Sequence, residues 1–112
     1  MAGDGLFGVH GAALRVRSQR MGVLASNIAN ASTPNFKARE VDFQAALAGM
    51  EGRADMEGAV RYRVPSQPSM DGNTVELSAE QTAFAENAVQ YQTTLAFLNG
   101  RISTLTRALR GE

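Results

Sequence analysis

The chain has 112 residues, contains no cysteine, and carries 11 basic and 11 acidic side chains, so its formal net charge is zero. A chain of this length forms one domain at most, with a modest core, and without cysteine it has neither disulfides nor thiolate metal sites. Its charges are uneven, with five basic groups against one acid in residues 1–39 and seven acids against three arginines in residues 40–76. This distribution suits contacts between copies better than it suits nucleic acid, which requires a concentrated basic face.

The chain shows no sign of a membrane span or a cleaved leader. No apolar run approaches the roughly 20 residues needed to cross a bilayer. The N-terminus has Asp4 where a secretory signal places a basic region. If the protein leaves the cytoplasm, we expect export without a cleaved signal peptide.

A first helix is predicted over about residues 11–30. Apolar residues recur every seven positions, with Leu24 between the last two, at Phe7, Leu14, Met21 and Ile28. Gly8 and Gly11 weaken the helix before Leu14, because each costs about 1 kcal/mol relative to alanine. Pro34 ends any helical continuation.

Two asparagines lie near the predicted end of this helix. Asn27 and Asn30 are three residues apart, just before Pro34. Their amides either satisfy carbonyl groups that the last helical turn leaves free or contact another subunit, and the residues leave both readings open.

The middle of the chain, about residues 33–73, is predicted to be extended and flexible. The stretch from Phe36 to Phe43 alternates loosely between apolar and polar residues, and Val60, Tyr62 and Val64 form an alternating trio that favours a short strand. Residues 48–73 are otherwise rich in glycine, proline, serine and charge, which is typical of loops.

A second helix is predicted over about residues 78–109. Ser78 and Gln81 have the spacing of a capping box at its start. Its apolar residues alternate in steps of four and three, the heptad period of a helix packed on a partner helix, at Phe84, Ala88, Tyr91, Leu95, Leu98, Ile102, Leu105 and Leu109. We therefore expect a mainly α fold with two long terminal helices pairing as a coiled coil around a short extended, β and loop middle segment.

No motif supports catalysis or a cofactor. The glycines from Gly3 to Gly8 match the letters of a dinucleotide fingerprint, but no strand precedes them. His10 is the sole histidine, and no acidic pair or serine has a partner at catalytic or metal-ligand spacing. We predict a protein that is not an enzyme, with no cofactor, no metal, no nucleic acid and no small-molecule substrate.

Two segments carry a resemblance to a known family. Residues 24–39, Leu24-Ala-Ser-Asn27-Ile-Ala-Asn30-Ala-Ser-Thr33-Pro34-Asn35-Phe36-Lys37-Ala-Arg39, closely resemble the N-terminal signature of bacterial flagellar rod and hook proteins. Residues 72–77, followed by Glu80, Phe84, Asn87 and Tyr91, resemble the C-terminal signature of the basal-body proximal rod proteins, and the short link resembles the B-type member.

The chain departs from the family pattern at two positions. Asn35 stands where the family usually has glycine, but asparagine also tolerates a positive φ, so we expect the turn to be kept. Glu76 stands where a shorter Asn or Asp is common, which puts a side-chain cap at that position in doubt.

The resemblance implies a structural subunit of the flagellar proximal rod. Such a subunit is a single rod-type domain that self-assembles with other axial proteins, links the membrane ring to the distal rod, and transmits torque. The implied location is the periplasm-spanning rod of the flagellar basal body. The implied partners are other rod proteins, the rod-to-membrane-ring adaptor, the membrane ring and the flagellar type III export apparatus.

We expect the assembly interface to include both terminal segments. Its predicted residues are Leu14, Met21, Leu24, Asn27, Ile28, Asn30, Thr33, Pro34 and Phe36, together with Phe84, Ala88, Tyr91, Leu95, Leu98, Ile102, Leu105 and Leu109.

Two alternatives stay open at this point. One is the C-type rod protein or another flagellar axial subunit. The other is a small coiled-coil or membrane-surface adaptor that would use Arg15, Arg17 and Arg20 against anionic lipid.

Overall fold

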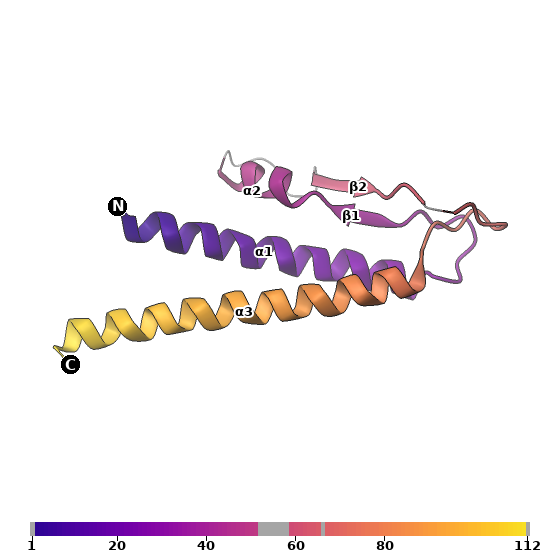
Figure 1. The fold of residues 1–112 in the computed structure, drawn as a ribbon. Coiled ribbons are helices and arrows are strands. Elements are labelled where there is room, and N and C mark those ends of the chain that lie inside the picture. The colour runs from indigo at the N-terminus through magenta and orange to yellow at the C-terminus, as the bar shows by residue number, and fades with distance from the viewer. Residues whose placement is uncertain (1, 52–58, 66, 112) are drawn as a thin grey trace.

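A computed structural model describes residues 2–51, 59–65 and 67–111. Helix α1 (Ala2–Ala29) and helix α3 (Leu77–Arg110) run antiparallel, with the two chain ends at the same end of the molecule (Figure 1). Strand β1 (Arg39–Val41), helix α2 (Phe43–Glu51) and strand β2 (Val60–Tyr62) lie on the other side of α1. The result is an elongated molecule with extents of 65 × 27 × 18 Å.

The pairing of two long terminal helices is confirmed, but α1 is longer than predicted. It begins at Ala2 rather than near residue 11. Gly8 and Gly11 lie within it, and a Cβ at either position would meet no neighbour within 4 Å. The helix continues through these glycines beside a contact with α3, where the rings of His10 and Phe97 are 4.7 Å apart.

The start of α3 differs from the predicted capping box. The helix begins at Leu77, and Glu76 is its N-terminal flanking residue, without a side-chain cap hydrogen bond. Ser78 therefore lies inside the first turn, and the doubt raised by Glu76 at this position is confirmed. The helix ends at Gly111, whose φ of 75° lets its N–H reach the carbonyls of Arg107 and Ala108.

The middle segment contains more structure than predicted. Strands β1 and β2 form an antiparallel pair in which Glu40 lies opposite Arg61, so both predicted extended stretches are confirmed, while Val64 lies beyond the strand. Helix α2 was not predicted. Asp42 caps it, because its Oδ1 accepts the N–H of Ala45 at 3.1 Å.

The apolar core lies between α1 and the middle segment. It contains Val16 and Val23 from α1, Val41 from β1, Ala46 from α2, and Ala59, which precedes β2. Val16 and Val23 are seven residues apart on a face of α1 that does not carry the predicted stripe. Helix α1 is thus packed on two sides, with α3 on one and the middle segment on the other (Figure 1).

Candidate assembly surface and the junction that positions it

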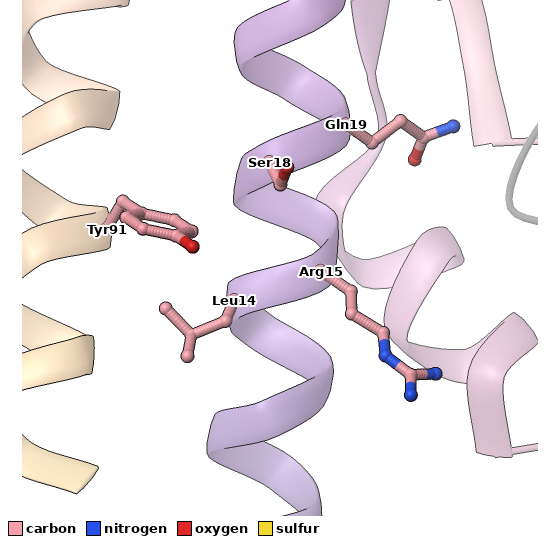
Figure 2. Close-up of a pocket in the computed structure, with 5 residues that line it drawn as sticks. All are labelled: Leu14, Arg15, Ser18, Gln19 and Tyr91. Atoms are coloured by element: carbon pink, nitrogen blue, oxygen red, sulfur yellow. The ribbon is translucent and has the colours of Figure 1, made fainter. Parts of the chain in front are cut away.

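Helix α3 packs on α1 through part of the predicted stripe. Phe84, Ala88, Tyr91 and Leu98 are half-buried. Figure 2 shows Tyr91 directed toward α1 and Leu14 directed toward α3. These two side chains line a shallow groove together with Arg15, Ser18 and Gln19. Leu14 and Tyr91 therefore belong to the contact between the two helices of one chain.

The other predicted stripe residues of α3 are exposed, most of them near its C-terminal end. The exposed fractions are 39% at Leu95, 54% at Ile102, 45% at Leu105 and 89% at Leu109. These four predicted interface residues continue the heptad spacing of the covered part. They form what we call the distal stripe, an apolar surface that α1 does not cover.

The predicted interface residues of α1 lie at different depths. Leu24 and Asn27 are fully buried within the chain, whereas Met21 and Ile28 are half-buried. Leu24 and Asn27 thus contribute to the packing of this chain itself.

The turn after α1 docks on the segment that precedes α3, and we call this contact the junction (residues 30–38 with 69–75). The side-chain amide of Asn73 donates to the carbonyls of Asn30 at 2.9 Å, Ala31 at 3.0 Å and Thr33 at 2.8 Å. Its Oδ1 accepts the N–H of Val75 at 2.7 Å. A side chain distant in sequence therefore satisfies carbonyl groups that follow the end of α1.

Two residues in the left-handed conformation face each other in the junction. Asn35 has φ 64° and Gly72 has φ 76°, so the conformation predicted for Asn35 is confirmed. A Cβ on Gly72 would lie 2.4 Å from Oδ1 of Asn35, so only glycine fits there without movement of the asparagine. The N–H of Asn35 donates to the carbonyl of Asp71 at 2.8 Å.

Threonine and lysine extend this contact along the chain. Ala38 N–H donates to Oγ1 of Thr74 at 2.7 Å, Thr74 N–H donates to the carbonyl of Phe36 at 3.0 Å, and Nζ of Lys37 donates to the carbonyl of Gly72.

The predicted interface residues Thr33 and Pro34 lie exposed on this turn, and Asn30 and Phe36 are half-buried. Asn30 also donates through its side chain to the Ser26 carbonyl at 2.8 Å, which is one of the two roles that the sequence left open for it.

Asn27 does not cap the end of α1 as Asn30 does; its side chain pairs with the backbone of β1. Its Nδ2 donates to the carbonyl of Arg39 at 2.7 Å, and its Oδ1 accepts the N–H of Arg39 at 3.0 Å, so the side chain pairs with β1 as a neighbouring strand would. The same Nδ2 donates to Oε2 of Glu80 at 3.0 Å. Asn27 therefore joins α1, β1 and α3.

Glu80 and Glu40 share one arginine. Nη1 of Arg63 lies 2.7 Å from Oε1 of the fully buried Glu80, and Nη2 of Arg63 lies 2.7 Å from Oε2 of Glu40. Arg20 binds Glu40 with both Nε, at 2.8 Å, and Nη2, at 3.1 Å. Arg63 follows β2, so this polar network connects all the layers of the molecule.

The network changes the proton affinity of two of its members. Burial alone would raise the pKa of Glu40, but the hydrogen bonds from Arg20 and the Val41 N–H and the charges of Arg20 and Arg63 hold it below its usual value. The hydrogen bond to Glu40 is the main reason that the pKa of Arg20 is raised. Both groups are therefore charged near neutral pH.

Comparison with known proteins identifies the family. Residues 7–37 match the model of a family described as "Flagella basal body rod protein". The "Flagellar basal body rod protein FlgB" of Cereibacter sphaeroides is 48% identical over 94% of both chains. The proteins of the same name from Aeromonas hydrophila and Escherichia coli K12 are 44% and 39% identical, over 97% and 88% of this chain and 96% and 88% of their own.

The chain belongs to the family of flagellar basal body rod proteins. The resemblance to the B-type proximal rod protein is confirmed, because each of these relatives carries the FlgB name. As a rod protein, it is a component of the flagellum that assembles with other components of the basal body. The matched residues 7–37 cover most of α1 and the first part of the junction.

Sequence reasoning missed several residues that hold this rod protein together. Asn73 and Asn87 are buried amides, and Arg20, Glu40 and Arg63 form the ion pairs described above. Asn73 and Asn87 both belonged to the C-terminal signature, whereas the charged residues resembled ordinary surface charge.

The described part of the chain offers neither a metal cluster nor a membrane-spanning helix. Within residues 2–51, 59–65 and 67–111, no three His, Asp or Glu side chains are grouped to hold a metal ion. Over the same ranges, no helix has the length and apolar character needed to cross a membrane.

Proposed function

We propose that this rod protein is a non-enzymatic structural subunit of the proximal rod. In this proposal it self-assembles with other axial proteins, links the membrane ring to the distal rod, and transmits torque. It reaches the rod through the flagellar type III export apparatus without a cleaved signal and contacts the rod-to-membrane-ring adaptor. The family membership supports this proposal, and the surface of α3 supplies the physical argument.

The distal stripe carries the proposal. Ile102, Leu105 and Leu109 lie at heptad spacing on the last turns of α3 and are 54%, 45% and 89% exposed. A continuous exposed apolar edge of this kind marks a surface that a partner covers. Because the spacing is that of a helix seam, the fitting partner is a helix of another axial subunit.

The junction supports a mechanical role. Hydrogen bonds from Asn73 hold the turn after α1, and Arg63 bridges Glu40 of β1 and Glu80 of α3. Cross-connections of this kind fix the angle between the two terminal helices. A subunit that transmits torque requires such a fixed angle, because load passes from one helix to the other.

The membrane-surface alternative has little support in the geometry. Two of the three arginines that would contact lipid are engaged within the chain. Arg20 is paired with Glu40, and Arg17 donates to Oε1 of Gln90 at 2.7 Å and lies over the ring of Phe43. Arg15 alone of the three is exposed, which leaves a single arginine for an anionic surface.

The test places a charge on the distal stripe. Ile102→Asp should abolish motility and rod assembly, because an unpaired carboxylate would be buried in the contact between subunits. The purified variant should fold like the wild type, since the side chain is 54% exposed in the free subunit. Basal bodies isolated from a strain that carries the variant should lack a rod, while the subunit is still exported.

Ser103→Asp is the matched control. Ser103 is the next residue, is exposed, and lies outside the stripe, so the same charge there should leave assembly intact. Normal motility of the Ile102→Asp strain would remove the distal stripe from the assembly interface.

A further inference from the structure

Two polar side chains are buried on the side of α3 that faces α1. Glu80 and Asn87 are fully buried and lie seven residues apart. Phe84 and Tyr91 occupy the adjacent positions of the same seam, in steps of four and three. The contact between the two helices thus contains two fully buried polar residues at equivalent heptad positions.

Asn87 is incompletely satisfied in this position. Its Nδ2 donates to the carbonyl of Arg17 at 2.8 Å. Its Oδ1 is buried and has no hydrogen-bond partner among the residues that the structure describes. A buried acceptor without a donor lowers stability, so a leucine, which has the same branched shape and no polar atoms, would favour folding more than this asparagine does. The presence of Asn87 therefore calls for an explanation other than stability.

The apolar side chains of the seam do not specify a single alignment. On α1 they recur every seven residues at Leu14, Met21 and Ile28, and on α3 Tyr91 is followed at the same interval by Leu98. If α3 slides along α1 by seven residues, about 10 Å, apolar residues meet apolar residues again. The helices of a second copy offer the same pattern, so apolar packing alone permits several pairings.

The polar pair distinguishes among these pairings. In the observed register, Glu80 meets Nδ2 of Asn27 at 3.0 Å and Nη1 of Arg63 at 2.7 Å. A slide of α3 in one direction removes the buried carboxylate from both partners by about 10 Å. A slide of α3 toward the C-terminal end of α1 carries the Asn87 amide away from the Arg17 carbonyl and toward the apolar side chains of Leu24 and Ile28. Either misalignment buries a polar group without its partner.

We propose that Glu80 and Asn87 select the partner and the register of α3, holding it antiparallel to α1 of its own chain against slipped pairings and against the helices of another copy. A buried polar residue in the contact between two helices lowers stability, but it favours the one alignment in which its hydrogen-bond partner is present. The inference concerns pairing within one chain, and its test on purified protein is separate from any assay of rod assembly.

The experiment measures the register directly. Because the chain has no cysteine, nitroxide labels can be placed at two exposed positions, Ala25→Cys on α1 and Asn99→Cys on α3. These positions are offset along the helix axis, so a slip of one heptad changes the distance between the labels by nearly the full 10 Å or so. Dilution with unlabelled protein of the same variant restricts the measured distances to single chains, and light scattering gives the mass.

The variants are Asn87→Leu, the double substitution of Glu80→Met with Asn87→Leu, and a matched control. Thr94→Leu is the control, because it adds an apolar side chain at a half-buried position of the same helix and keeps both polar residues. We expect Asn87→Leu to raise the melting temperature by about 5 °C and to add a second distance population or a larger assembly. The double variant should show more of both, and Thr94→Leu should keep one distance and the wild-type mass.

The result decides the proposal in every case. A folded double variant with one distance and the wild-type mass overturns it, as does a control that slips as much as Asn87→Leu. If the double variant does not fold, Asn87→Leu decides alone. A second population in that variant supports the proposal, and a single wild-type distance refutes it.

Discussion

Asn35 is the one non-glycine residue with a positive φ, 64°, among the residues that the structure describes. Its N–H bonds to the Asp71 carbonyl, and its side chain lies where a Cβ on Gly72 would be. The left-handed conformation costs little for asparagine and much more for a β-branched residue. The backbone of this one residue therefore directs the chain from α1 toward β1.

Substitution of Asn35 tests that role. Asn35→Gly should change the free energy of unfolding by less than about 0.5 kcal/mol, because glycine adopts positive φ freely. Asn35→Val should lower it by about 2 kcal/mol, because valine is strained there. Urea denaturation of the purified variants measures both values, and Ser32→Val, at an exposed position of the same turn, controls for the effect of valine. Equal stability of the Asn35→Val and Asn35→Gly variants would contradict this account.

At the scale of elements, α2 shows why a short helix escapes prediction. It has nine residues, and its apolar positions Phe43, Ala46 and Leu47 cover little more than one turn. An isolated helix of this length is unstable in water, so its packing on α1 and its cap maintain it. The signal in the sequence was Asp42, a good capping residue placed directly before that apolar trio.

Removal of the cap should weaken α2 specifically. Asp42→Ala should lower the free energy of unfolding by about 1 kcal/mol, because the N–H of Ala45 loses its acceptor, while Asp42→Asn should be nearly neutral. Amide hydrogen exchange should become faster at Ala45 and Ala46, whereas exchange in the middle of α3 should not change. Gln44→Ala, at an exposed position of the same helix, is the control. Unchanged exchange in Asp42→Ala would show that packing alone holds α2.

The long helices were predictable because their patterns repeat over many turns. The apolar period identified both α1 and α3, and the alternation around Val41 and Val60 identified the two strands. The second face of α1, with Val16 and Val23, was missed, because the stripe through Leu14 and Met21 already accounted for one partner.

The contacts of the junction and of the polar network were not predictable by the same means. Asn73 donates to carbonyls that lie 40 to 43 residues earlier in the chain. Arg63 contacts Glu40 and Glu80 from a segment rich in glycine and charge. No period in the sequence encodes such pairs, because each depends on how separate elements meet in space. Arg63 and Glu40 resemble solvated surface charge until the fold brings them together.

At the scale of the whole molecule, a small apolar core is supplemented by charged contacts between layers. The apolar cluster between α1 and the middle segment is built on small buried side chains, which are Val16, Val23, Val41, Ala46 and Ala59. Side chains of this size supply limited apolar area, and the contacts of Glu40 with Arg20 and Arg63 add to the attachment between α1 and the strands. The attachment of the middle segment should therefore depend on the charge of Glu40.

That dependence predicts how stability changes with pH. Burial acts to raise the pKa of Glu40, but its bonds to Arg20 and Val41 and the charges of both arginines hold the pKa below 4.5, its ordinary value. Because the folded state binds this proton less tightly than the unfolded state, the stabilisation is fully present above the ordinary pKa. It is lost as the pH falls through the lower pKa of the folded protein. Denaturation from neutral pH to about pH 3 should therefore show that the wild type exceeds Glu40→Gln in stability by an amount that shrinks below about pH 4.5. A difference between the two proteins that stays constant over this range would mean that the ionised carboxylate of Glu40 does not hold the layers together.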